Sequence, residues 1–246
     1  GNRVSTDTPD IDTGLASIRQ RIGAAARAAG RQPDDVRLIA VTKYMPSAYV
    51  EKAMAAGHHC FGENTLQGAM NKQPLLDDPA NEWHFIGHLQ TNKAKKVPAH
   101  FNWLHTLDSL RLARKLSDSA LRADTCLNVL LQVNIANDPD KYGLAPDSVY
   151  AFTDELLAAQ LAGIRLCGLM TIGRRVADPG QTRGSFAALR ELGDSCAARF
   201  GIEHFRELSM GMSNDFELAV AERATMVRVG SAIFGPRPVS NDQMPK

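Results

Sequence analysis

The sequence has almost no charge imbalance and few aromatic residues. Its 28 basic and 27 acidic residues leave a formal net charge of +1, which gives no general attraction to nucleic acid or to an anionic membrane surface. Aromatic residues make up 6% of the 246 residues and are too scattered to form a base-stacking platform. We therefore predict neither a nucleic-acid partner nor a membrane partner.

Long hydrophobic runs and paired cysteines are also lacking. The longest apolar runs are far too short to span a bilayer. The cysteines form no C-x-x-C pair and lie far apart, at Cys60, Cys126, Cys167 and Cys196. This spacing is typical of free thiols in a reducing compartment, and it does not predict a structural zinc site. The first residues do not resemble a secretory leader, so we expect a cytoplasmic protein in which residues 1–9 form a disordered terminus.

What the sequence does have is a regular alternation of strand-like and helix-like segments. A helical stripe covers residues 11–30, and eight short apolar runs follow, separated by helical patterns. The predicted strands are 36–43, 58–61, 82–86, 101–106, 126–134, 164–172, 205–209 and 225–229. The predicted helices between them are 47–56, 63–72, 89–97, 109–121 (with Asp108 as a plausible N-cap), 147–161, 182–200 and 215–223.

Eight strands that alternate with helices predict a parallel α/β sheet. At this length, with an apolar fraction of 44%, eight units favour a closed (β/α)8 TIM barrel with an extra N-terminal helix. We find no linker, and we expect a single domain over residues 1–246. The irregular segment 173–184 is predicted to be a mobile loop on the face that carries the site.

Lys43 ends the first predicted strand. In a parallel barrel, the carboxyl ends of the strands open onto the face where binding and catalysis take place. An amine in low-dielectric surroundings there can lose its proton well below the reference pKa of about 10.4 and form a Schiff base. The alternative is a lysine that simply extends from the strand end into solvent.

Small and hydroxyl-bearing residues follow the seventh and eighth predicted strands. Ser213, Gly230 and Ser231 could offer hydroxyl and amide donors to an anion, and a short helix is expected to begin near Ser231. Barrels frequently bind a phosphate at these two loops. Two glycine-rich turns with incidental serines are the alternative. Arg228 lies on the same inward face as Gly230, and it would either pair with a carboxylate or donate to a ligand atom.

The histidines and the lysine run are weaker signals. His84 could stack on a ring in a pocket, but it could equally be a core histidine with its hydrogen bonds satisfied. His58 and His59 have no metal-ligand spacing with an acidic partner, and no metal is assigned. The basic run at Lys93, Lys95 and Lys96 is typical of a solvated helix face.

Seven segments of the sequence resemble, in order, the pyridoxal 5′-phosphate (PLP) homeostasis proteins. They are AVTK at 40–43, FGEN at 61–64, WHFIGHLQ at 83–90, QVN at 132–134, GLM at 168–170, SMGMS at 209–213 and RVG at 228–230. The family fold is a single barrel like the N-terminal domain of alanine racemase. Tyr44, Met45 and Gly68 differ from the residues common in the family, but none of them belongs to the implied cofactor contacts.

The resemblance also implies a cofactor and a set of binding residues. Lys43 would hold PLP covalently as a Schiff base, and Arg228 would face its pyridine nitrogen. The phosphate would be held by Ser213, Gly230 and Ser231, while Asn64 and His84 would line the ring pocket and Met210 would belong to the same cofactor-binding set. The family further suggests a monomer, with apo-forms of PLP enzymes as possible recipients of the cofactor.

Arg228 bears on whether the protein is an enzyme. Arginine only donates hydrogen bonds, so a ring nitrogen that faces it must be unprotonated and is a poor electron sink. Racemisation tolerates this state of the ring. In alanine racemase, however, a tyrosine from a second domain acts on the opposite face of the ring, and we expect no room for such a domain before Lys246. Because Tyr44 is adjacent to Lys43 in sequence, we do not expect it to replace that tyrosine. The leading interpretation is a non-enzymatic protein that stores or delivers PLP. A weak amino-acid racemase and an aldolase acting on a sugar phosphate stay open.

Overall fold

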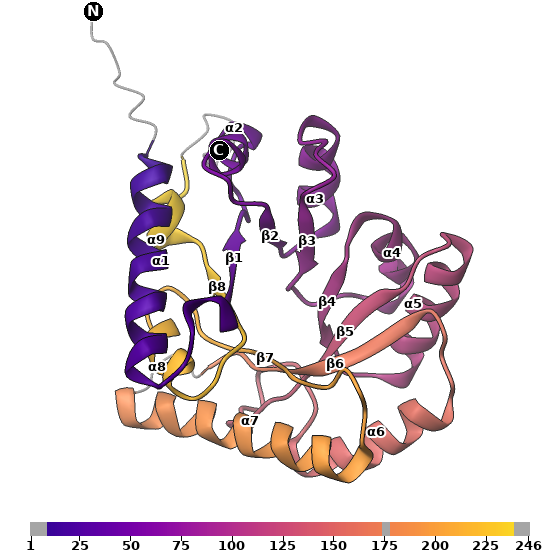
Figure 1. Cartoon of the computed structure of the whole chain (residues 1–246). Coiled ribbons are helices and arrows are strands. Elements are labelled where there is room, and N and C mark those ends of the chain that lie inside the picture. Colours follow the sequence, from indigo (N-terminus) through magenta and orange to yellow (C-terminus); the bar gives the residue numbers. More distant parts are fainter. Residues whose placement is uncertain (1–8, 174–177, 239–246) are drawn as a thin grey trace, which may run out of the picture.

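The computed structural model describes residues 9–173 and 178–238, and it contains a closed barrel of eight parallel strands (Figure 1). The strands follow one another around the barrel in chain order, and the last pairs with the first, with Ile39 beside Arg228. The strands are β1 (Arg37–Val41), β2 (Cys60–Glu63), β3 (Glu82–Phe85), β4 (Trp103–Leu107), β5 (Leu127–Gln132), β6 (Ile164–Met170), β7 (Glu207–Ser209) and β8 (Met226–Val229). The predicted (β/α)8 fold is confirmed.

Helices cover the outside of this barrel (Figure 1). The α-helices are α1 (Ile11–Ala28), α2 (Ser47–Ala55), α3 (Leu66–Lys72), α4 (Val97–His100), α5 (Leu110–Arg122), α6 (Val149–Ala158), α7 (Pro179–Phe200), α8 (Phe216–Ala221) and α9 (Ser231–Phe234). Short 3₁₀ turns are η1 (Pro33–Asp35), η2 (Gln73–Leu75), η3 (Thr91–Lys96) and η4 (Pro146–Ser148). The elements thus alternate as the hydrophobic pattern predicts.

The strands are buried on both faces because the barrel and the helices each take alternate residues. Inward-facing residues form a small cluster that includes Ile39, Leu130 and Met226. Outward-facing residues such as Ala40 and Val129 join the larger core under the helices. This alternation decides which side chains can reach a site inside the barrel.

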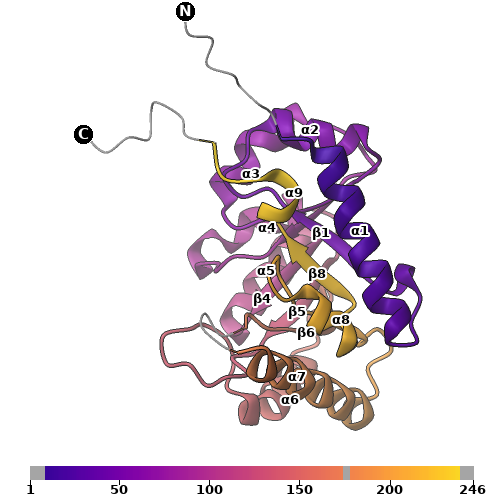
Figure 2. The same cartoon turned by 90° about the vertical axis from the view of Figure 1, so that its left-hand side faces the viewer.

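The extra helix α1 packs on the outside, beside α8 and α9 (Figures 1 and 2). Its apolar stripe includes the buried residues Ile11, Leu15 and Ile18, as the sequence predicts. Gly14 lets α1 come very close to α9, because a Cβ at this position would lie 2.6 Å from the carbonyl oxygen of Ile233. Helix α1 therefore supports the short helix that follows the last strand.

Several predicted boundaries were wrong, and the caps explain three of them. Helix α3 begins at Leu66, after Thr65, whose hydroxyl accepts from the Gly68 amide; Glu63 belongs to β2 instead. Ser109, not Asp108, caps α5. Helix α7 begins at Pro179, since Asp178 caps it. The segment predicted as helix 89–97 is largely the 3₁₀ turn η3, which continues into α4.

Part of the predicted mobile loop 173–184 is therefore helical, and residues 174–177 of it lie outside the described residues, as do residues 1–8 of the predicted disordered terminus. In the described ranges, no helix is both long and apolar enough to cross a membrane. All four cysteines are free thiols, as predicted from their spacing.

Candidate functional site

A pocket of about 1040 Å³ opens at the carboxyl ends of the first and last two strands. It is lined by residues that follow β1, β7 and β8, and by a few from the segments after β5 and β6. Five of the residues singled out in the sequence line it together: Lys43, Ser213, Arg228, Gly230 and Ser231. Segments from opposite ends of the chain thus supply an amine, two hydroxyls and a guanidinium to one cavity.

The backbone that leads into Lys43 is held by a buried ion pair. Glu63, at the end of β2, is 1% exposed, and its carboxylate accepts from Lys72 Nζ over 2.5 Å. The same carboxylate oxygen accepts from the hydroxyl of Thr42 over 3.0 Å, while Lys72 also donates to the Thr42 carbonyl oxygen. Because Thr42 is fixed from two sides, the residue after it leaves the strand in a defined direction.

Tyr44 forms part of the rim of the pocket. It has φ of +62°, which is uncommon for a bulky residue and is often found near functional sites. Tyr44 is 55% exposed, and the centroid of its ring lies 4.8 Å from Lys43 Nζ and 4.1 Å from Arg237 Cζ. This cation–π stack places an aromatic surface directly beside the Lys43 amine.

The opposite wall offers neutral hydrogen-bond donors. The hydroxyl oxygens of Ser213 and Ser231 lie 3.4 Å apart, and the first amides of α9 have no acceptor within the helix. Gly230 lets the backbone pass closely under this corner, since a Cβ there would lie 3.3 Å from both Cβ and the carbonyl oxygen of Val41. Two hydroxyls, free amides and a glycine together form a corner that fits a phosphate group.

Arg228 forms the inner end of the pocket and is 3% exposed. Its Nη1 donates to Ser209 Oγ over 2.6 Å, and its Nη2 donates to the carbonyl oxygen of Thr171 over 3.0 Å. Burial lowers its pKa to about 10, so the guanidinium stays charged at neutral pH. The sequence left open whether Arg228 pairs with a carboxylate or donates to a ligand atom. These two hydrogen bonds go to neutral oxygens.

Three predicted residues do not line the pocket. Met210 is fully buried in the core under the helices, because Ser209 before it points into the barrel and the side chains alternate. His84 lies in the barrel interior, where it is hydrogen-bonded and stacked parallel to Trp103 at 5.6 Å. The alternative interpretation of His84 as a core histidine therefore describes its position, and His84 does not line this pocket.

Asn64, at the end of β2, is a different case. Its Oδ1 is buried and has no hydrogen-bond partner, and in the described part of the chain it is the single buried side-chain nitrogen or oxygen of this kind. A buried polar atom without a partner is costly. A ligand with a hydrogen-bond donor would satisfy this oxygen. The ligand would have to extend past the residues that line the pocket, because Asn64 is not one of them.

Comparison with known proteins identifies the family. The model of the alanine racemase N-terminal domain matches residues 14–238. A pyridoxal phosphate homeostasis protein of Pseudomonas aeruginosa is 43% identical over 227 residues, covering 92% of this chain and 96% of the relative. Its counterpart in Escherichia coli K12 is 40% identical, covering 94% and 98%. The chain belongs to the pyridoxal phosphate homeostasis protein family. The resemblance seen in the sequence is thereby confirmed.

A solved structure of the same type is PipY of Synechococcus elongatus with PLP bound. It is 38% identical to this chain, with a TM-score of 0.82, and the match covers 92% of this chain and all of that one. At this identity and coverage, the comparison extends over the whole described barrel of this homeostasis-family protein.

Sequence reasoning did not assign a role to Lys141, which also lines the pocket. Its Nζ donates to the carbonyl oxygen of Gly173 over 2.6 Å. Lys141 lies in the irregular segment between β5 and α6, where no strand end or helix start marks it. Asp215 and Tyr44, which line the same pocket, were likewise not predicted as site residues.

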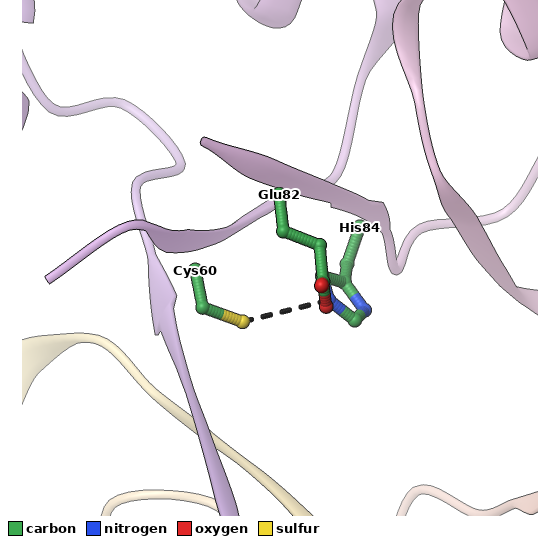
Figure 3. Close-up of side chains that lie close together, drawn as sticks. All are labelled: Cys60, Glu82 and His84. Carbon is green, nitrogen blue, oxygen red and sulfur yellow. Dashed lines mark hydrogen bonds and ion pairs between the residues drawn. The ribbon is translucent and has the colours of Figure 1, made fainter. Parts of the chain in front are cut away.

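Cys60, Glu82 and His84 bring three potential metal-ligand atoms together in the barrel (Figure 3). However, His84 Nε2 and Glu82 Oε1 lie 2.6 Å apart, whereas two such ligands on a tetrahedral ion would be about 3.3 Å apart. Arg37 already places a positive charge 2.8 Å from the same oxygen. Burial raises the pKa of the Cys60 thiol far above its usual range. We interpret the cluster as a hydrogen-bonded group and not as a metal centre.

Proposed function

We propose that this chain binds PLP in the pocket above β1, β7 and β8, and that it stores the cofactor or delivers it to other proteins. The observation that supports this most strongly is the convergence of Lys43, Ser213, Arg228 and Ser231 on one cavity. The solved relative PipY, whose structure holds PLP, and the naming of the curated relatives point in the same direction.

Each residue would meet a different part of the cofactor. PLP supplies an aldehyde, and the Lys43 amine is the group that would attach to it covalently. The hydroxyls of Ser213 and Ser231, with the amides near Gly230, would donate to the phosphate. Arg228 would donate to the pyridine nitrogen, and the orphan oxygen of Asn64 would accept a donor of the ligand.

We infer a carrier role because the Arg228 guanidinium has only hydrogen-bond donors. A ring nitrogen that faces it stays unprotonated, which weakens the ring as an electron sink. Binding and release need only an amine and an open face, and the pocket is open to solvent beside Tyr44 and Met212, both of which are exposed. We further propose that apo-forms of PLP enzymes receive the cofactor and that the protein acts as a monomer in the cytoplasm.

The attachment residue can be identified chemically. Borohydride reduction of the PLP-loaded protein, followed by peptide mass spectrometry, should place the pyridoxyl group on Lys43. Lys43→Ala should lose the adduct. Lys93→Ala, in the 3₁₀ turn η3 and outside the lining of the pocket, should keep it. An adduct on Lys141 or Lys93 in the parent protein would show that the assignment is wrong. Equal affinity for pyridoxal and PLP would contradict the phosphate corner.

A further inference from the structure

A chain of hydrogen bonds crosses the barrel interior below the pocket. It starts at Arg228, whose Nη1 contacts Ser209 Oγ at 2.6 Å. Ser209 Oγ lies 2.8 Å from His105 Nδ1, and His105 Nε2 lies 2.8 Å from His84 Nδ1. His84 Nε2 then lies 2.6 Å from Glu82 Oε1. Four strands, β8, β7, β4 and β3, each contribute to this chain.

The middle residues of this hydrogen-bond chain are buried, whereas its far end is partly exposed to solvent. Ser209, His105 and His84 are fully buried. The Glu82 side chain is 36% exposed at the opposite end of the barrel, where Arg37 Nη1 also donates to it over 2.8 Å. The chain therefore connects the cofactor pocket with a carboxylate at the other end of the barrel.

The two ends determine the direction of every hydrogen bond. Arg228 can only donate, and an ionised Glu82 can only accept. A neutral imidazole has one donor and one acceptor, and burial lowers the pKa of both His84 and His105. Donation must then run from Arg228 through Ser209, His105 and His84 to Glu82. Both histidines carry their proton on Nε2.

We propose that His105 is a positioning residue for Arg228, acting through the hydroxyl of Ser209. With its proton on Nε2, His105 accepts the Ser209 hydroxyl hydrogen, and the Ser209 oxygen is left free to accept from Arg228. If His105 carried its proton on Nδ1, Ser209 Oγ would face two donors, and its own hydrogen would lose its acceptor. The chain thus holds Arg228 as a fixed donor at the inner end of the pocket.

The first test needs no cofactor. In the apo-protein with ¹⁵N-labelled histidine, His84 and His105 should both show the Nε2–H tautomer at neutral pH. A proton on His105 Nδ1, or an imidazolium at either residue, would overturn the proposal. This measurement is made without PLP, so its outcome does not depend on the proposed function. Only one part of the proposal rests on that function, namely which ligand atom Arg228 meets.

The second test uses two substitutions that each keep one half of the His105 contacts. His105→Asn can still accept from Ser209 near the Nδ1 position, whereas His105→Gln can still donate to His84 near the Nε2 position but leaves Ser209 without its acceptor. With PLP labelled at the ring nitrogen, the Asn variant should keep the parent's ¹⁵N shift. The Gln variant should change the shift and bind PLP up to about tenfold more weakly.

A control separates positioning from general damage to the core. His58→Gln changes a buried histidine that does not belong to the hydrogen-bond chain. It should lower the stability of the protein and leave the ¹⁵N shift of the PLP ring nitrogen unchanged. Equal behaviour of the Asn and Gln variants would overturn the proposal. If neither His105 variant folds, Ser209→Ala replaces them and should change the ¹⁵N shift of the ring nitrogen. An unchanged shift would mean that Arg228 is held in place without the hydrogen-bond chain.

Discussion

His58 is a buried histidine whose two ring nitrogens are both used in the neutral form. Arg19 Nη2 lies 2.9 Å from His58 Nδ1 and can only donate to it. Nε2 therefore carries the proton and donates to the carbonyl oxygen of Cys60 over 2.8 Å. A second proton would have to face the Arg19 guanidinium. Burial, the largest cause, lowers the pKa of His58 to about 4.

This shift makes the fold sensitive to acid. Below pH 6.5 the unfolded chain binds a proton at His58, while the folded protein does not until about pH 4. The free energy of unfolding should therefore be unaffected by His58 above pH 6.5 and fall as the pH drops toward 4, by at most about 3 kcal/mol.

Urea unfolding at pH 7 and pH 5 should show this loss in the parent, with about 2 kcal/mol of it within that interval. His58→Gln, which can still accept and donate, should lose less. His204→Gln, at an exposed histidine, is the matched control and should follow the parent. Equal losses in the parent and in His58→Gln would contradict the assignment, because His84 and His105 would then account for all of the acid sensitivity.

Single residues were predictable from the sequence where a strand end places them. Lys43, Ser213 and Ser231 follow apolar runs, and the carboxyl ends of parallel strands meet on one face. It was harder to predict whether a strand side chain points into the barrel or out toward the helices, because this depends on the register of the strand. A shift of one residue turns a side chain to the other face. Met210, which the family resemblance places in the cofactor-binding set, has its side chain in the core under the helices. The contacts of His84 with Cys60, His105 and Trp103 form only when β2, β3 and β4 are placed together.

At the scale of the elements, β6 contains a position where only glycine fits. Gly168 has φ of +154°, and a Cβ there would lie 1.9 Å from the carbonyl oxygen of Glu207 in β7. The pairing of β5 with β6 shifts register at the same level, between Val129 and Leu130. Gly168 lies within the predicted strand 164–172, and the structure shows that it marks a close approach between neighbouring backbones.

Gly168→Ala should destabilise the protein by about 3 kcal/mol or more, because the added methyl group forces β6 and β7 apart. Gly184→Ala is the matched control. Gly184 lies within α7 with open space around it, so alanine there should raise the free energy of unfolding by about 0.5–1 kcal/mol. Both values follow from denaturant unfolding. A mild effect at Gly168 would show that the barrel wall yields at this point.

Helix starts were the least predictable part of the elements. Asp108 and Ser109 are both good N-cap residues, and the sequence does not distinguish them. In the structure, Ser109 accepts from the Leu112 amide, while Asp108 accepts from the amide of Gly143, which lies far along the chain. A contact between distant segments therefore decided a choice that local pattern left open.

At the scale of the whole molecule, the central question is whether the PLP-loaded protein turns over the amino acids that it binds. In the proposed binding mode the ring nitrogen only accepts from Arg228, so removal of the α-proton from a bound amino acid should be slow. Incubation of the loaded protein with L-alanine in deuterated water should give exchange far below the roughly 1–1,000 per second typical of enzymes. A cofactor-free acceptor enzyme mixed with the loaded protein should regain activity. Multiple-turnover exchange at an enzyme's rate would mean that the protein is a racemase.

The overall barrel was predictable because alternation and length are properties of the whole chain. Eight apolar runs separated by helical patterns allow few other folds at this size. The chain from Arg228 to Glu82 was not predictable in the same way. Its members are single residues on four strands. The sequence pointed to Arg228 and His84, but nothing in it showed that Ser209 and His105 connect them.

The closure of β8 against β1 also determines when the site can exist. Lys43 follows the first strand, and Arg228 and Ser231 belong to the last strand and the helix after it. During synthesis, the lysine leaves the ribosome long before the residues that would hold a phosphate. A growing chain therefore carries the amine without the rest of the pocket. In the proposed binding mode, retention of PLP requires β8 and α9 as well as Lys43, so its capture would report that the barrel has closed.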